Sequence, residues 1–318
     1  MNQYNLYKTT SIFFIILAIF SFFFGFYFDE NSAGAGGPTG DFEVIYNNFQ
    51  IFLKNDLITS IAHPDYFDSR PPTAYILQEM LNPFAEEKVN YRRSVFVISL
   101  LVPILFYFCL RQKFKNDEKI LLILISSTIF LSPYFRTSAF WGLQENYGLI
   151  FLLLSFLSII FLNRANVENT LKTYFSLFTV TFLSSLCIYF DQKLIIIPII
   201  CFFKIILSNN KLKFKIFSAF CYFVFSLPYI YFIKVWGSLI PTTAAATRSY
   251  SFEDGIYADH LGYASTIIAF YLLPLLLFKN KKLILLIQNF FSDKKNYLFI
   301  ILFFFYLVYL VVFFNSNT

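Results

Sequence analysis

The sequence predicts an all-α polytopic membrane protein with about nine transmembrane helices. Of its 318 residues, 58% are hydrophobic and 22% are aromatic, whereas only 14% are charged. A soluble globular domain usually contains about 45–50% apolar and about 25% charged residues, so this composition excludes a soluble fold. The apolar residues are also gathered into separate runs that approach the roughly 20 residues an α-helix needs to cross a bilayer.

These runs define the predicted helices. They lie near 9–28, 94–110, 120–134, 146–162, 173–190, 194–208, 216–235, 261–278 and 296–314. The runs at 120–134 and 194–208 are short, so these helices must extend into flanking polar residues or be broken. The first run is interpreted as an uncleaved anchor, because it is too long and too weakly preceded by positive charge for an ordinary signal peptide. Since the inner loops are short, residues 1–318 are expected to form a single membrane domain.

Charged residues indicate the orientation. With a cytoplasmic N-terminus, the inner segments are 1–8, 111–119, 163–172, 204–215 and 279–295. These segments hold 16 of the 25 Lys and Arg residues but only four of the 19 acidic residues, which is the bias of cytoplasmic loops. Topology and contact with anionic membrane lipid explain the basic loops, so no nucleic-acid partner is expected. The polar segments 29–90, 135–145 and 236–260 are then extracytoplasmic.

The segment 29–90 is the largest of these loops and is rich in carboxylates. It begins with Asp29 and Glu30, passes through a Gly-rich stretch, and reaches GDFE at 40–43. Apolar residues then recur at helical spacing opposite polar ones, which predicts an amphipathic helix near 42–57. The apolar positions are Phe42, Ile45, Phe49 and Phe52. Such a helix is expected to lie on the membrane surface, with Asp41 suited to cap its start.

A proline turn closes the loop. The sequence at 63–72 is HPDYFDSRPP, in which Asp68 and Ser69 are suitable caps and the prolines suit the first positions of a helix. We therefore expect a short helix near 71–81 that returns towards the bilayer. The histidines His63 and His260 have no zinc-partner spacing, and the four cysteines fall in or beside apolar runs as expected of buried free thiols.

The order of these motifs resembles that of the GT-C membrane glycosyltransferases, particularly the protein O-mannosyltransferase and lipid A aminoarabinose transferase branch. In that branch a DE-type pair begins the first extracytoplasmic loop and a sequence close to YFDHPPLVAYL ends it. This chain has GDFE at 40–43 and YFDSRPPTAYIL at 66–77, with looser similarity at 132–151 and 189–198. The resemblance covers roughly residues 1–200. Either Asp41 or Asp29-Glu30 corresponds to the catalytic pair.

The resemblance implies an integral enzyme of a bacterial inner (cell) membrane. It would move a sugar from a polyprenyl-phosphate donor to a glycan, lipid or protein acceptor on the extracytoplasmic side. Such a reaction needs a carboxylate to take the proton of the acceptor hydroxyl. We predict Asp41 as this base, with Glu43 beside it. Asp29, Glu30 and Asp68 are candidates for acceptor binding, for a divalent metal ion, or for holding the loop together, and the sequence leaves metal dependence open.

The reaction also needs cations to stabilise the departing lipid phosphate. The predicted outward-facing cations near helix ends are Arg70, Arg136, Lys193 and Arg248. Two alternatives apply to Arg136 and Lys193. Their long side chains could snorkel to the membrane interface, or Arg136 could pair locally with Glu145 and Lys193 with Asp191.

The sequence leaves two other functions open. One is a polysaccharide polymerase or ligase, which would have its largest outer loop late in the chain and rich in Arg. The other is a non-catalytic transporter or membrane subunit. A transporter would have internal repeats and helices broken at corresponding positions in two halves, and the sequence has neither.

Overall fold

The computed structural model describes residues 3–31, 37–115, 118–162, 170–208 and 210–247, together with Asn289, Ser292, Tyr297, Ile301 and Phe305. Every regular element in these ranges is helical, which confirms the all-α class. The chain divides into two compact units, Met1–Arg248 and Ser249–Thr318, and the fold described below is that of the first. The predicted runs at 261–278 and 296–314 lie outside the described ranges.

Five helical stretches are long and apolar enough to cross a membrane, which supports an integral membrane protein. They are Lys8–Tyr27 in α1 (Gln3–Tyr27), Lys88–Lys113 in α5 (Lys88–Ser99) and α6 (Leu101–Lys113), Glu145–Leu162 (α9), Leu171–Phe190 in α10 (Thr170–Phe190), and Leu212–Trp236 (α12). Each contains most of one predicted run. The remaining two runs of the described ranges are the short ones.

Both short runs depart from a simple span. The first forms α7 (Lys119–Ser127), the 3-10 helix η1 (Thr128–Leu131) and α8 (Pro133–Phe140), and it bends by 66° where α8 begins. The bend lies at Pro133, which cannot donate a backbone hydrogen bond. The second forms η2 (Gln192–Ile195) and α11 (Ile196–Ile206), whose 11 residues span only about 16 Å. A full span at 194–208 is therefore not supported.

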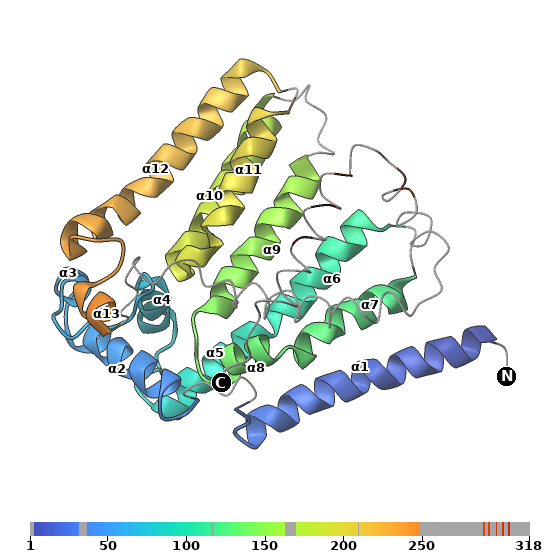
Figure 1. Ribbon diagram of the computed structural model, residues 1–318, viewed down its shortest axis with the longest axis horizontal. Helices are drawn as coiled ribbons and strands as arrows, with labels where there is room; N and C mark the ends of the chain where they lie inside the picture. Colours follow the sequence, from blue (N-terminus) through green and yellow to red (C-terminus); the bar gives the residue numbers. More distant parts are fainter. Residues whose placement is uncertain are drawn as a thin grey trace. The chain divides into compact units, whose positions relative to one another are not determined.

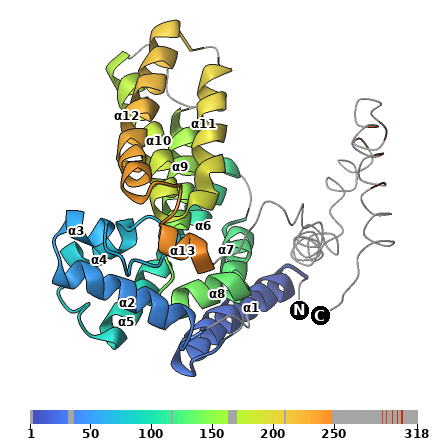
Figure 2. The same ribbon diagram turned by 60° about the vertical axis from the view of Figure 1, so that its left-hand side comes forward.

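The long helices lie side by side, and the shorter ones gather at one end of them. Helix α10 packs against α9, α11 and α12, while α9 also packs against α6. Figures 1 and 2 show α2 (Asp41–Lys54), α3 (Leu57–Ile61), α4 (Thr73–Leu81) and α13 (Thr242–Thr247) together at the lower end of this layer. The polar segment 29–90 thus covers the helix ends instead of extending away from them.

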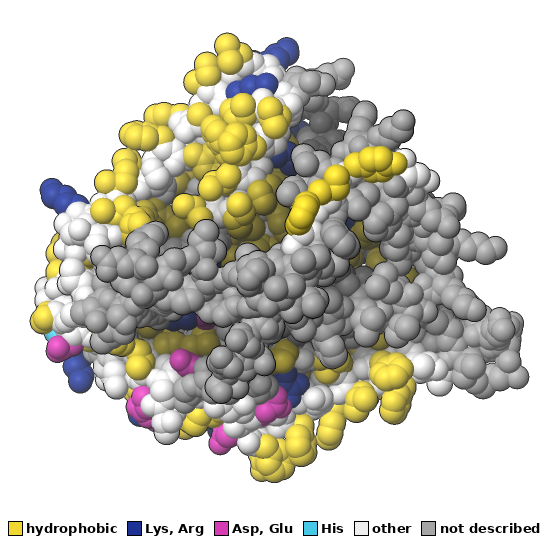
Figure 3. Space-filling model, in the orientation of Figure 1, with side chains coloured by type: hydrophobic (Ala, Val, Ile, Leu, Met, Phe, Trp, Pro, Cys, Tyr) yellow, Lys and Arg dark blue, Asp and Glu magenta, His cyan; other side chains and the backbone are white. Residues whose placement is uncertain are grey.

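Charge differs between the two ends of the first unit. The Asp and Glu side chains visible in Figure 3 lie along the lower edge, near α2 and α5, with some Lys and Arg side chains among them. Lys and Arg side chains mark the upper end, beside the start of α12, where Lys211 and Lys213 are exposed. The C-terminal ends of α6, α9 and α11 all lie towards the upper side of Figure 1.

The predicted helix near 42–57 is present as α2, but protein and not lipid covers its apolar face. Phe42, Ile45, Phe49 and Phe52 are all buried in the main core. The Phe49 ring lies 4.8 Å from that of Tyr91 in α5. The apolar face of α2 therefore packs on the protein, and the placement of this helix at the membrane surface stays a prediction.

The other predicted elements of the loop differ at their ends. After α2 the chain forms α3, whose N-cap Asp56 accepts from the backbone N–H groups of Ile58 and Thr59 at 3.1 Å. The predicted helix at 71–81 begins two residues later, with Pro72 as its N-cap residue and no side-chain cap. Asp68 and Ser69 therefore do not cap it. The four cysteines are buried free thiols, as predicted.

Candidate functional site

Arg70 lies between two carboxylates that come from distant parts of the chain. Its Nη1 is 3.3 Å from Asp68 Oδ1, and its Nη2 pairs with Glu145 Oε1. The Asp68 side chain is only 3% exposed and that of Arg70 is 18% exposed. Since Glu145 is the first residue of α9, this cluster joins the turn before α4 to a helix long enough to span a membrane. The planar guanidinium suits two carboxylates at once.

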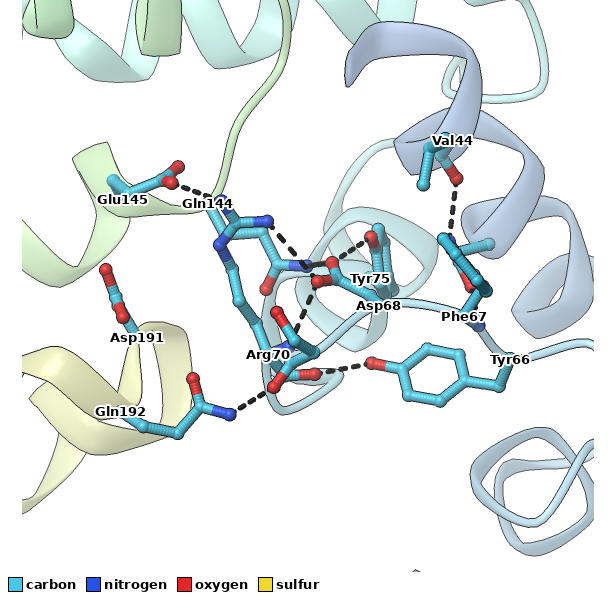
Figure 4. A network of polar contacts seen from close by, with 12 residues as sticks. Val44, Tyr66, Phe67, Asp68, Arg70, Tyr75, Gln144, Glu145, Asp191 and Gln192 are labelled. Carbon is cyan, nitrogen blue, oxygen red and sulfur yellow. Dashed lines mark hydrogen bonds and ion pairs between the residues drawn. The ribbon is translucent and has the colours of Figure 1, made fainter. Parts of the chain in front are cut away.

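Asp68 is the centre of the cluster because four donors converge on it (Figure 4). Its Oδ1 accepts from the Arg70 backbone N–H at 3.0 Å and from Arg70 Nη1. Its Oδ2 accepts from the Tyr75 hydroxyl at 2.5 Å and from Gln144 Nε2 at 2.7 Å. A buried carboxylate is stable only when it is paired and hydrogen-bonded in this way.

Backbone contacts hold the turn from both sides. The Tyr66 hydroxyl donates to the Arg70 carbonyl at 2.8 Å, and Gln192 Nε2 donates to the Ser69 carbonyl. The Phe67 backbone N–H donates to Asn48 Oδ1 of α2 at 2.8 Å. The turn therefore has contacts to α2 and η2 as well as to α9, and its conformation is fixed by tertiary structure.

Electrostatic interactions keep Arg70 charged and Tyr75 protonated, so that both side chains can donate to Asp68. Burial by itself lowers the pKa of Arg70, but the Asp68 and Glu145 carboxylates more than offset this and raise it above its usual value. Burial, followed by the charge of Asp68, raises the pKa of Tyr75 well above its usual value. Tyr75 consequently keeps its proton and remains a donor to Asp68.

Gly142 sets the path of the chain into this cluster, and its replacement is expected to be costly. It has φ +71°, and an added Cβ would lie 3.1 Å from Tyr91 Cε1. We expect Gly142→Ala to lower the free energy of unfolding by about 2 kcal/mol, from left-handed strain and crowding together. Gly237→Ala is the matched control, because Gly237 has φ +70° with no atom within 4 Å of the added Cβ. The control should lower the free energy of unfolding by only about 1 kcal/mol. Thermal unfolding of the two purified variants measures both changes.

Two of the predicted carboxylates, Asp29 and Glu30, tie the end of α1 to its neighbours. Asp29 has φ +53°, and its Oδ1 is 2.6 Å from Arg92 Nη1. Arg92 also lies over the Trp141 ring at 4.2 Å. Glu30 receives Arg136 Nε at 2.8 Å, and Arg136 Nη2 pairs with its other oxygen. Arg136 is therefore paired with Glu30 and not with Glu145, contrary to the local-pairing alternative.

The guanidinium of Arg136 is almost fully buried. Its Nη1 donates to the Phe130 carbonyl at 3.0 Å and to Ser21 Oγ at 3.2 Å. Its Nη2 donates to the Ser21 carbonyl at 2.9 Å. With the residue only 5% exposed, these contacts use the donors that a phosphate would need.

Asp41 and Glu43 have different surroundings although they lie in the same turn of helix. Asp41 is the first residue of α2, follows the N-cap Gly40 and does not cap the helix itself. Among the described residues, its half-buried side chain has no ion-pair or hydrogen-bond partner. Glu43 instead receives Lys88 Nζ at 2.6 and 2.7 Å.

The remaining predicted cations are Lys193 and Arg248. Lys193 is exposed in η2, and its backbone N–H donates to Asp191 Oδ1 at 3.0 Å. Its ammonium has no ion-pair partner in the described part of the chain, so the expected side-chain pairing with Asp191 is not present. Arg248 lies outside the described residues. Of the predicted phosphate-binding cations, Arg70 and Arg136 are thus paired with carboxylates, whereas Lys193 is exposed.

Glu145, Gln144 and Gln192 were not among the predicted site residues, although they complete the cluster. The sequence did offer a signal, because LQEN at 143–146 and DQK at 191–193 place polar side chains next to long apolar helices. In the described ranges, Gln144 Oε1 and Glu145 Oε2 are buried with no hydrogen-bond partner. Also within these ranges, no group of three His, Cys, Asp or Glu residues is arranged to hold a metal ion.

Comparison with known proteins identifies no relative. No family model, no curated protein and no solved structure matches the chain.

Proposed function

We propose that the protein is an integral membrane glycosyltransferase. It moves a hexosyl or pentosyl group from a polyprenyl-phosphate donor to an envelope glycan, lipid or protein acceptor on the extracytoplasmic side, with Asp41 as the general base. The observation that carries this proposal is the state of Asp41. Within the described residues, its carboxylate is half-buried and free of any cation or hydrogen-bond donor, as a base that must accept a proton needs to be.

The contrast with the other loop carboxylates supports this choice. Asp29, Glu30, Glu43 and Asp68 each have a cationic partner. A carboxylate whose oxygens already accept from a cation has fewer lone pairs open to an acceptor hydroxyl. Of the two sequence alternatives, Asp41 is therefore favoured over Asp29-Glu30, whose contacts suit a role in fixing the end of α1.

The same reasoning reduces the number of cations that could assist the leaving phosphate, because some of them are already paired. Two carboxylates balance the charge of Arg70, and Glu30 together with carbonyl acceptors occupies Arg136. Lys193 is exposed and unpaired among the described residues, so it is the better of the described candidates for a phosphate contact. We assign the phosphate role to Lys193, with Arg248 as the second cation.

The distribution of charge supports the proposed orientation. Basic side chains lie near the start of α12, and the carboxylates of α2 lie at the opposite end of the unit (Figure 3). The basic end then faces the cytoplasm, and Asp41 lies on the extracytoplasmic side where lipid-linked sugars are presented.

Replacement of Asp41 tests the function directly. In membranes or proteoliposomes supplied with labelled hexosyl and pentosyl polyprenyl phosphates, we expect Asp41→Asn to lower the rate of sugar transfer by at least about a hundredfold. The control is Glu79→Gln, which neutralises an exposed carboxylate of α4 in the same loop and should leave the rate within about twofold. Unchanged transfer by the Asp41 variant would remove Asp41 from the mechanism. Absence of transfer by the unaltered protein with every donor would contradict the proposed function.

A further inference from the structure

A polar groove runs between α2 and the turn that follows α3. Its volume is about 540 Å³, within the range of pockets that hold small ligands. It is lined by Val44, Asn47, Asn48, Gln50, Ile51, Lys54, Asn55, His63, Asp65 and Phe67. None of the catalytic or phosphate roles proposed above uses these residues.

The chemistry of the lining favours an uncharged ligand with many hydroxyl groups. Four of the ten lining side chains are carboxamides, a group that has both donors and an acceptor. Asn48 and Asn55 use theirs partly on the backbone of α2 and the following turn, which leaves Asn47 and Gln50 for a ligand. A hydroxyl group likewise donates and accepts, so neighbouring sugar hydroxyls match such a surface. The charged lining groups are Lys54 and Asp65, whose opposite charges leave no strong preference for an anion or a cation. The Phe67 side chain, 38% exposed, adds an apolar surface for the face of a sugar ring.

The wall of the groove is held in place before any ligand arrives. Asn48, only 3% exposed, accepts from the Phe67 backbone N–H at 2.8 Å and donates to the Val44 carbonyl at 2.7 Å. Figure 4 shows Val44 and Phe67 on the two sides of this contact. A preformed site loses less conformational entropy when a ligand binds. This helps it to bind ligands such as sugars, whose individual contacts are weak.

The groove also has a defined relation to Asp41. On an α-helix, residues three and four apart share a face, so Asp41 lies on the same face of α2 as Val44, Asn48, Ile51 and Asn55. Asp41 precedes Val44 by three residues, or about 4.5 Å along the helix axis. A chain lying in the groove therefore has one end directed towards the Asp41 carboxylate.

From this arrangement we infer that the groove binds a neutral stretch of the acceptor glycan and presents its terminal hydroxyl to Asp41. The inference rests on the proposed transferase function and specifies its acceptor as an oligosaccharide. Asn47, which is exposed, and Gln50, which is half-buried, are the carboxamides best suited to contact the sugar without supporting the fold.

Glycan binding by the purified full chain tests the inference without requiring transfer. The probe is an array of neutral, amino-substituted and acidic oligosaccharides, read with the detergent-solubilised protein. We expect binding of neutral oligosaccharides, weakened at least tenfold by the double variant Asn47→Ala/Gln50→Ala. The matched control is Asn90→Ala, which removes a carboxamide that bonds Glu87 outside the groove and should leave binding unchanged.

The outcomes separate this inference from the proposed function. Binding that is absent, restricted to acidic glycans, or unaffected by the double variant would overturn the groove assignment even if sugar transfer depends on Asp41. Conversely, groove-dependent binding of neutral glycans without any transfer activity would refute the transferase proposal and leave a glycan-binding groove. A thermal unfolding profile matching that of the unaltered chain shows that the double variant is folded.

Discussion

Replacing Arg136 with Met is expected to lower the free energy of unfolding by about 3 kcal/mol. Removing one partner of a buried ion pair usually costs about 3–5 kcal/mol, because the other charge is left uncompensated. The lower value applies because the Glu30 side chain remains 33% exposed and can recover some hydration. The carbonyl groups of Ser21 and Phe130 would also lose a donor. Thermal unfolding of the purified protein should show this as a fall in melting temperature of about 6–12 °C.

A second variant separates the charge effect from a loss of packing. The double variant Arg136→Met/Glu30→Leu removes both charges and should recover most of the lost stability, since apolar replacement of a whole buried pair is often neutral. Lys88→Met is the exposed comparison, because Lys88 and Glu43 are 46% and 42% exposed. The Lys88→Met replacement should lower the free energy of unfolding by less than about 1 kcal/mol. If Arg136→Met also lowers the free energy of unfolding by less than about 1 kcal/mol, the structural role of Arg136 is refuted. Arg136 would then be available to bind the lipid phosphate.

Local pattern predicted much of the fold. The helix at 41–54 could be foreseen because its apolar residues recur at a period of 3.6, and the break near Pro133 because proline removes a backbone donor. Periodicity does not identify what covers an apolar face. The helix was expected at the membrane surface, whereas the rings of Tyr91 and Trp141, 49 and 99 positions after Phe42, each lie 6.4 Å from the Phe42 ring.

The candidate site was less predictable, because its contacts join residues far apart in sequence. The sequence drew attention to YFDSRPP, but the partner of Arg70 is Glu145, 75 positions later. Nearness in sequence suggested that Arg136 pairs with Glu145 and Lys193 with Asp191, and neither pair is present. Ion pairs are chosen by tertiary packing, and only the topology of α1, α8 and α9 brings Glu30 to Arg136 and Glu145 to Arg70.

Asp68→Ala is the second substitution with a large expected effect, and it distinguishes a structural carboxylate from a substrate contact. The sequence left open whether Asp68 binds acceptor or metal, or holds the loop together. Its side chain is nearly inaccessible, and four donors from three residues already surround it. Removing it leaves the Tyr75 hydroxyl and the Gln144 amide without an acceptor and Arg70 with one carboxylate instead of two. We expect a loss of about 3–5 kcal/mol in the free energy of unfolding.

The matched control for Asp68→Ala is Asp65→Ala in the same turn. The Asp65 side chain is 85% exposed and only 3.9 Å from His63 Nδ1, so its removal should change the free energy of unfolding by less than about 0.5 kcal/mol. Both variants are measured by thermal unfolding in the same detergent. If the Asp68→Ala protein has the melting temperature of the unaltered chain but no longer transfers sugar, Asp68 is a substrate contact. A large fall in melting temperature instead means that the Asp68 carboxylate holds the turn before α4 in place.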